Sequence, residues 1–157
     1  MSDLHIVLVH PEIPWNTGNT ARSCLAFAAH LHLIEPLGFS LDAREVRRAG
    51  LDYWEHVALT LHPDWETFEA RLGELGEPWF LTREASLPLH DAPLRPPAVF
   101  VLGRESVGLP RALRQRYRDR LVGIPQREGV VRSLNLSTAA ALAAYEFRTR
   151  FPLQSRG

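Results

Sequence analysis

Short apolar segments alternate with amphipathic ones along the chain, and this alternation limits the folds that it can adopt. Runs of apolar residues predict strands over 4–9, 31–34, 57–61, 79–82, 98–102 and 121–124. Helical spacing of apolar residues, with turn and cap signals, predicts helices over 20–30, 44–49, 65–75, 110–117 and 135–151. Strands that alternate with helices predict an α/β fold, in which a parallel sheet has helices on both faces.

The size and composition of the chain fit one domain over residues 1–157. Hydrophobic residues make up 45% and charged residues 23%, which excludes long disorder and coiled coils. No apolar run is long enough for a membrane span, and the first residues lack the pattern of a signal peptide. Cys24 is the single cysteine, so it excludes an intrachain disulfide, and we expect it to pack inside a helix. A cytoplasmic protein without membrane contact is expected.

The charges balance, with 18 basic and 18 acidic residues, and every basic residue is arginine. A neutral total argues against a basic coat for nucleic acid but leaves local basic surfaces open. Candidate clusters are Arg44, Arg47 and Arg48; Arg111, Arg114, Arg116, Arg118 and Arg120; and Arg148 and Arg150. The alternative for each cluster is a solvated face of salt bridges.

Several familiar site patterns are missing from the sequence. The chain has no Gly-x-Gly-x-x-Gly after its first strand and no Gly-x-Ser-x-Gly. Gly103 and Gly108 have Walker A spacing, but Leu-Pro follows them in place of Lys-Ser/Thr. His30 and His32 can share a strand face, but with no third ligand nearby we expect ordinary edge histidines and no metal. Dinucleotide, nucleotide-triphosphate and esterase sites are therefore disfavoured.

Three segments of unusual composition follow predicted strands, over residues 11–22, 102–110 and 124–137. Ligands of open α/β sheets bind at the carboxyl ends of the strands, so these segments can form one site. Purely structural interpretations also remain open. The glycines can permit tight bends, Asn16 or Thr17 can cap the helix after the first strand, and Ser133 or Asn135 can cap the last helix.

The order of these segments resembles a known family. Asn16-Thr-Gly-Asn-x-x-Arg22, Leu102-Gly-x-Glu-x-x-Gly-Leu-Pro110 and Arg132-Ser-Leu-Asn-Leu-Ser137 are similar to the three motifs of SpoU-type RNA ribose 2′-O-methyltransferases of the SPOUT superfamily. Residues 33–39 and 47–53 are similar to the group that methylates the tRNA wobble nucleotide. The resemblance covers roughly residues 4–150; Leu102, where the group commonly has Phe, is a departure from it, and residues 126–131 form a slightly longer stretch.

The resemblance implies an α/β fold with a C-terminal trefoil knot that binds S-adenosylmethionine against three loops. Carried over by motif position, the residues expected to contact the cofactor are Leu81, Gly103, Ile124 and Ser133. Thr82 and Leu134 are expected beside them, and Gly108, like Gly103, is expected to allow close approach of the backbone. For Leu81 and Ile124 the alternative is plain strand core.

The resemblance also implies catalytic roles for Arg22, Glu105, Ser133 and Asn135. A guanidinium stays protonated, so we expect Arg22 to hold a phosphate and stabilise charge on the 2′-oxygen instead of accepting a proton. Glu105 is expected to orient Arg22 or act as the base, and Ser133 and Asn135 to position the ribose.

The expected substrate is the anticodon stem-loop of tRNA, methylated on the wobble ribose of cytidine or uridine. The expected RNA contacts are Asn19, Arg22, Arg47, Arg48, Tyr145 and Arg148; for Tyr145, packing of the last helix is the alternative. The family works as homodimers in which Arg22 would lie near the partner's cofactor site. A different tRNA or rRNA target and a non-catalytic RNA-binding module are the alternative functions.

Overall fold

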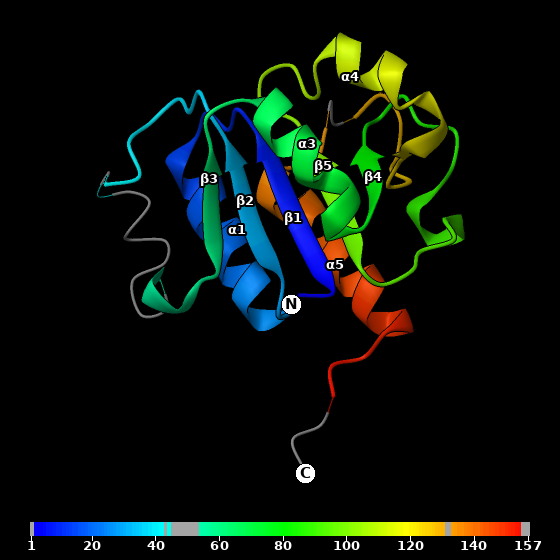
Figure 1. The fold of residues 1–157 in the computed structure, drawn as a ribbon. Helices are drawn as coiled ribbons and strands as arrows, with labels where there is room; N and C mark the ends of the chain where they lie inside the picture. Colours follow the sequence, from blue (N-terminus) through cyan, green and yellow to red (C-terminus); the bar gives the residue numbers. More distant parts are fainter. Residues whose placement is uncertain (1, 43, 45–53, 131–132, 155–157) are drawn as a thin grey trace.

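The computed structural model describes residues 2–42, 44, 54–130 and 133–154. A parallel sheet forms its centre, with strand order β3-β2-β1-β5-β4-β6 (Figure 1). The strands are β1 Leu4–Val9, β2 His30–Ile34, β3 Leu59–His62, β4 Glu77–Leu81, β5 Ala98–Leu102 and β6 Leu121–Val122. The predicted α/β class with a parallel sheet is confirmed. The trefoil knot stays a prediction.

Helices cover both faces of the sheet, as predicted. The helices are α1 Pro14–Ala26, α3 Trp65–Leu75, α4 Arg111–Arg116 and α5 Leu136–Arg150, with short 3-10 turns at Trp54–His56, Leu89–Asp91 and Arg118–Arg120. Helices α1 and α5 pack side by side on one face, and α3 lies on the other (Figure 1). Alternate residues of β1 serve the two cores: Ile6 packs with the first pair, and Val7 with Phe68 of α3.

The start of α1 differs from the prediction of a loop over residues 11–19. The helix begins at Pro14, because a proline in the first turn already has helical φ and needs no N–H partner. Asn16 and Thr17 are buried inside the helix and do not cap it. The Ile13 N-cap offers no side-chain bond, and the carboxylate of Glu105 stands at this helix start instead. A partner distant in sequence therefore decides where α1 begins.

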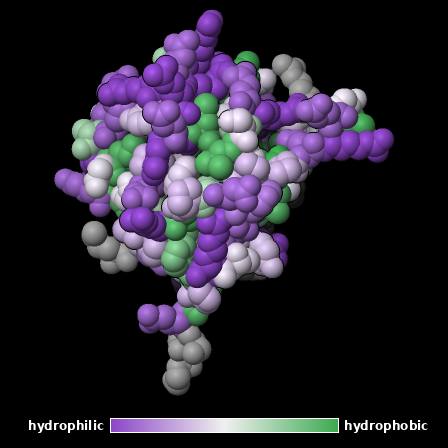
Figure 2. Space-filling model, turned by 90° about the vertical axis from the view of Figure 1, so that its right-hand side faces the viewer, coloured by the Kyte–Doolittle hydropathy of each residue, from purple (hydrophilic) through white to green (hydrophobic). Residues whose placement is uncertain are grey.

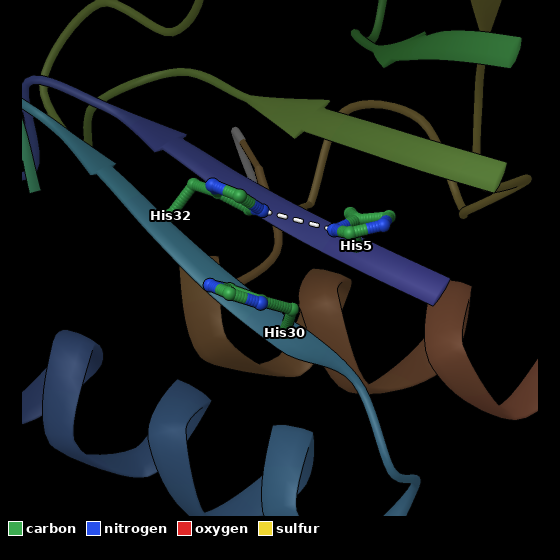
Figure 3. A group of neighbouring side chains, drawn as sticks. All are labelled: His5, His30 and His32. Atoms are coloured by element: carbon green, nitrogen blue, oxygen red, sulfur yellow. Dashed lines mark hydrogen bonds between the residues drawn. The ribbon is translucent and has the colours of Figure 1, made fainter. Parts of the chain in front are cut away.

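Four histidines, His5, His30, His32 and His62, lie together on the α3 face of β1, β2 and β3, which corrects the expectation of edge histidines. Figure 3 shows three of them, His5, His30 and His32. His32 is only 2% exposed because β2 lies between two other strands. Its ring accepts or donates on both sides, to His5 at 2.9 Å and to His62 at 3.0 Å. Burial, reinforced by the neighbouring His30, lowers the pKa of His32 to about 2, so the imidazole is neutral.

Cys24 is buried in α1, and this burial raises its pKa to about 12, as its predicted packing role requires. Over the described residues, we find no helix with the length and apolarity that a bilayer crossing needs. The side of the molecule that carries β4 and α4 is mostly hydrophilic, with apolar patches near its middle (Figure 2). Residues 45–49 of the helix predicted over 44–49 lie outside the described residues.

Candidate cofactor pocket and RNA interface

A cavity of about 780 Å³ lies beyond the carboxyl ends of β4, β5 and β6. Loops from three parts of the chain line it: residues 81–84, residues 102–108 and residues 133–136. The strand order changes direction between β1 and β5, and the crevice beside such a switch point is where open α/β sheets bind ligands. The predicted convergence of separate loops into one pocket is what the structure shows.

Close backbone contact shapes the loop after β5. A Cβ atom on Gly103 would lie 2.0 Å from the carbonyl carbon of Gly108 and 2.1 Å from the nitrogen of Leu109. Gly108 has a φ of +71°, and its N–H donates to the carbonyl of Arg104 at 2.9 Å. Glycine is therefore required at position 103 by space and favoured at 108 by backbone angle.

Two carboxylates join the β1–α1 loop to the β5–α4 loop reciprocally. Glu105 accepts the backbone N–H groups of Glu12 and Ile13, at 2.9 and 2.6 Å, and the Asn16 amide at 3.2 Å. Glu12 in turn accepts the N–H and the hydroxyl of Ser106, at 2.9 and 2.5 Å. These bonds from Ser106 hold the pKa of the Glu12 carboxyl below its ordinary value. We call this arrangement the carboxylate clasp.

The clasp changes the interpretation of Glu105. Both carboxylate oxygens of Glu105 accept hydrogen bonds from N–H groups. These contacts do not support the expectation that Glu105 acts as the general base or orients Arg22. Its contacts make it a bracing residue. Glu12 and Asn16 are the bracing partners that sequence reasoning missed. Both residues lie in the segment over residues 11–22 that the sequence already marked as unusual. The sequence alone does not show which residue a carboxylate or an amide in such a segment will bind.

An amide bridge carries the bracing on to the third loop. The Asn135 side chain donates from Nδ2 to Oδ1 of Asn16 at 2.9 Å. Oδ1 of Asn135 accepts the N–H groups of Ser137 and Thr138 at the start of α5, which confirms the predicted cap. Glu105, Asn16 and Asn135 thus form one continuous chain that connects the loop after β5, helix α1 and the start of α5.

The structure brings together all the predicted cofactor residues. Those that line the pocket are Leu81, Thr82, Gly103, Glu105, Gly108, Ile124, Ser133, Leu134 and Asn135. Arg22 lies outside the pocket lining, exposed on α1 together with Asn19. Tyr145 of α5 is 59% exposed and meets the Phe27 ring edge-on. Arg47 and Arg48 lie outside the described residues.

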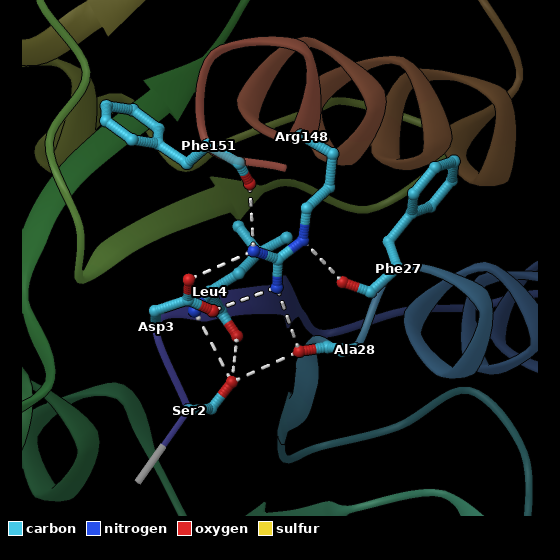
Figure 4. Close-up of polar contacts among 7 residues, drawn as sticks. All are labelled: Ser2, Asp3, Leu4, Phe27, Ala28, Arg148 and Phe151. Carbon is cyan, nitrogen blue, oxygen red and sulfur yellow. Dashed lines mark hydrogen bonds and ion pairs between the residues drawn. The ribbon is translucent and has the colours of Figure 1, made fainter. Parts of the chain in front are cut away.

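Arg148 is a correction to the expected RNA contacts (Figure 4). Its side chain is 8% exposed and forms a two-point ion pair with Asp3, at 3.0 and 2.9 Å. The same guanidinium donates to the carbonyls of Phe27, Ala28 and Phe151. The N–H donors of Arg148 are therefore bound to groups of the protein itself. Arg148 joins the end of α5 to the start of β1, and the expectation that it contacts RNA is wrong.

Internal partners also engage several other arginines of the expected basic clusters. Arg114 pairs with Glu84, Arg116 with Glu69, Arg120 with Glu77 and Arg150 with Glu146. Arg83 and Arg104, which sequence reasoning missed, are exposed at the pocket, and within the described ranges neither forms an ion pair. Their position after β4 and β5 was the signal that could have found them.

The family of the chain follows from comparison with known proteins. Residues 3–145 match the SpoU rRNA Methylase family. The chain belongs to this family. A relative from Bacillus subtilis (strain 168) is 48% identical over 147 residues, which cover 91% of this chain and 90% of the relative. A tRNA (cytidine(34)-2'-O)-methyltransferase from Burkholderia pseudomallei (strain 1106a) is 45% identical over 146 residues, which cover 90% of this chain and 92% of that protein.

Solved structures of other proteins share the fold of this chain. One, from work on the 2-OH methylation of C/U34 on tRNA, has a TM-score of 0.89 at 40% identity, with 97% of this chain and 99% of that chain covered. An AdoMet-bound rRNA methyltransferase from Sinorhizobium meliloti has a TM-score of 0.86 at 23% identity, with 98% of this chain but 59% of that chain covered. The second likeness shows the fold alone.

Proposed function

We propose that residues 1–157 form a single cytoplasmic domain that transfers a methyl group from S-adenosylmethionine to the ribose 2′-oxygen of the tRNA wobble nucleotide, cytidine or uridine. The pocket in which three separate loops meet carries this proposal. Relatives that align over about nine-tenths of the chain are named for this reaction at cytidine 34, which supports the choice of substrate.

The shape of the pocket fits S-adenosylmethionine. Its volume of about 780 Å³ lies within the 300–1,000 Å³ usual for cofactor sites. The missing side chain at Gly103 lets two turns of the same loop approach closely, so that their backbone N–H and C=O groups are available to a flat ring. Leu81, Ile124 and Leu134 supply apolar walls, and Thr82 and Ser133 supply hydroxyls. When bound, the cofactor supplies an electrophilic methyl group on a sulfonium.

The chain's own contribution to the reaction is alignment. A fixed geometry of two reactants supplies about 7–11 kcal/mol of the barrier. The chain of Glu105, Asn16 and Asn135 fixes the loop after β5 and the start of α5 relative to α1, so these residues act by positioning. Ser133 is the hydroxyl that faces the pocket from the third loop, and it is placed to hold the ribose. Arg22 holds the target phosphate and stabilises charge that grows on the 2′-oxygen.

Arg22 does not line the pocket of its own chain, and we propose a homodimer through α1 and α5 that brings it to the pocket of the partner. These helices lie side by side and expose large apolar side chains, namely Trp15, Leu25, Leu142 and Tyr145. Exposed apolar patches of this kind mark interaction sites. Placing this face between two copies would bring Arg22 of one towards the pocket of its partner.

Local arginines must hold the RNA because the total charge is zero. We propose Arg83 and Arg104 at the pocket, with Asn19 and Arg22 on α1 and Arg47 and Arg48 from the expected motif. Tyr145 is placed either to pack in the dimer or to stack on a base.

Methyl transfer to bulk tRNA from labelled S-adenosylmethionine tests the function. We expect one labelled site, the wobble ribose. Label on rRNA or at another tRNA position would contradict the proposed substrate and identify that RNA site instead. If no methyl group were transferred although tRNA still bound, the non-catalytic alternative would be favoured.

A further inference from the structure

The proposed reaction leaves four histidines of the sheet, three of them buried and His30 half-buried, without a task. His5 lies on β1, His30 and His32 on β2, and His62 on β3. His5 and His30 are direct partners in the parallel register, and His32 lies one side-chain repeat further along the same face. Imidazoles in these positions replace the apolar side chains that a two-faced parallel sheet usually carries.

We propose that His5, His30 and His32 form a binding site for a divalent transition metal, with Zn²⁺ as the first candidate. One nitrogen of each ring lies within 4.8 Å of the others, and the site is drawn in Figure 3. Imidazole is a ligand that Zn²⁺ prefers, at about 2.0–2.1 Å, so tetrahedral binding needs nitrogens roughly 3.3 Å apart. The nitrogens of His5 and His32 are now 2.9 Å apart, so an ion requires these two rings to move apart by about 0.4 Å.

The outer nitrogens of two of the three ligands, His32 and His30, already have hydrogen-bond partners. His32 contacts His5 through Nε2, and its Nδ1 is 3.0 Å from His62 Nε2. His30 Nε2 is 2.7 Å from the hydroxyl of Thr60, which leaves its Nδ1 for the metal. Such outer hydrogen bonds fix the ring orientation and the tautomer of a ligand.

Metal binding here needs no net release of protons. One proton lies between His5 Nδ1 and His32 Nε2 in the hydrogen-bonded pair, and both nitrogens must present lone pairs to a metal. With that proton on His5 Nδ1, it moves to Nε2 of His5, while His32 keeps its own proton on Nδ1 facing His62 Nε2, so each imidazole stays neutral.

Access and charge set the expected affinity. His30 is half-buried and borders a surface depression with Ser2 and Asp3, so an ion and a water as fourth ligand have a path to the site. Arg71 of α3 acts electrostatically on His30 and His32 and opposes a cation, whereas the Asp3 carboxylate acts on His5 in the opposite sense.

Titration of chelator-treated protein with Zn²⁺, followed by calorimetry, tests the site, and Co²⁺ gives a visible spectrum of tetrahedral nitrogen ligation. We expect one ion per chain and a raised Tm. His30→Gln removes a ligand, so it should weaken Zn²⁺ binding by more than the roughly 10–100-fold that follows from loss of a residue hydrogen-bonded to a ligand. His30 is the least buried of the three ligands, so this variant preserves the fold if His5→Asn or His32→Asn does not.

His90→Gln is the matched control because His90 is exposed and lies outside the cluster. It should leave binding unchanged. Wild-type affinity no higher than that of His30→Gln, or loss of binding in His90→Gln, would overturn the proposal and leave the cluster as a hydrogen-bonded core. Methyl transfer is measured separately, so failure of the metal site does not count against the proposed reaction.

Discussion

The amide nitrogen of Asn135 lies 2.9 Å from the amide oxygen of Asn16, although 119 residues of chain separate them. This bond connects the start of α5 to α1, and through Glu105 to the loop after β5. The pocket is therefore held open by side chains that do not need to touch either reactant.

Asn135→Asp separates the bridge from the cap. The aspartate keeps an oxygen for the N–H groups of Ser137 and Thr138 but cannot donate to Asn16. We expect a nearly unchanged Tm and a cofactor affinity at least about tenfold lower, measured by calorimetry. Asn135→Ala should lose the cap as well, at about 1 kcal/mol of unfolding free energy. Equal cofactor affinity in Asn135→Asp and wild type would contradict the bracing role.

Gly103→Ala should disrupt the pocket because the new Cβ would overlap the backbone of Gly108. We expect loss of cofactor binding and destabilisation of several kcal/mol, in the range of severe core overpacking. Chemical unfolding and a cofactor titration measure both effects.

Gly73→Ala is the control for that substitution. Gly73 lies in α3, and a Cβ atom added there would meet no other atom within 4 Å, so alanine should stabilise the helix by up to about 1 kcal/mol. If Gly73→Ala and Gly103→Ala had similar stability and cofactor affinity, the lack of space for a Cβ atom would not explain why position 103 is glycine.

Arg22→Lys keeps the positive charge and removes the planar fork. If the guanidinium holds the phosphate and the 2′-oxygen together, kcat should fall by about a hundredfold, the scale for loss of one oxyanion donor. Cofactor affinity should stay constant, since Arg22 does not line the pocket of its own chain. Near-full turnover would exclude an essential two-point contact.

The Asp3–Arg148 ion pair predicts a loss of stability in acid. The guanidinium of Arg148 holds the pKa of Asp3 below its ordinary value of 3.8. In acid, Asp3 of the unfolded chain therefore takes up a proton more readily than Asp3 of the folded protein. The ion pair contributes its full stabilisation above about pH 4, and this contribution is lost as the pH falls through the pKa of Asp3 in the folded protein. Asp3→Asn should lower the Tm at pH 7, and its difference from wild type should shrink towards pH 2.

Asp91→Asn is a charge-matched control for the same titration, because Asp91 is exposed. It should leave the wild-type pH profile in place. If the difference in Tm between Asp3→Asn and wild type stayed constant from pH 7 to pH 2, protonation of Asp3 would not be coupled to folding, and the prediction would be wrong.

The double variant Arg83→Gln/Arg104→Gln tests the RNA surface. Each lost phosphate contact should reduce the slope of log affinity against log salt by about 0.7–0.9. Filter binding of tRNA over a salt series measures the slope. Arg116→Gln is the control because Glu69 already pairs with Arg116 at 3.0 Å, and it should not change the slope.

The sequence predicted the elements whose signals are local. Strand β5 is a continuous apolar run between Pro97 and Gly103, and α3 has apolar residues at helical spacing after the cap at Asp64; both have the predicted bounds. The predicted pocket loops also meet, because carboxyl ends of parallel strands share one edge.

The remaining features depend on contacts between distant segments. The start of α1 was missed because its partner, Glu105, comes from another loop. Arg148 looked like a basic surface residue until Asp3 met it across the fold. The histidine cluster needed the strand order, since only pairing of β1 with β2 sets His5 beside His30.

The amide of Asn135 has a consequence for protein synthesis. One wall of the cavity, residues 133–136, follows every strand of the sheet along the chain and so leaves the ribosome after them. A polypeptide that ends before these residues lacks that wall of the cavity. The pocket is therefore complete only after every strand of the sheet has been synthesised.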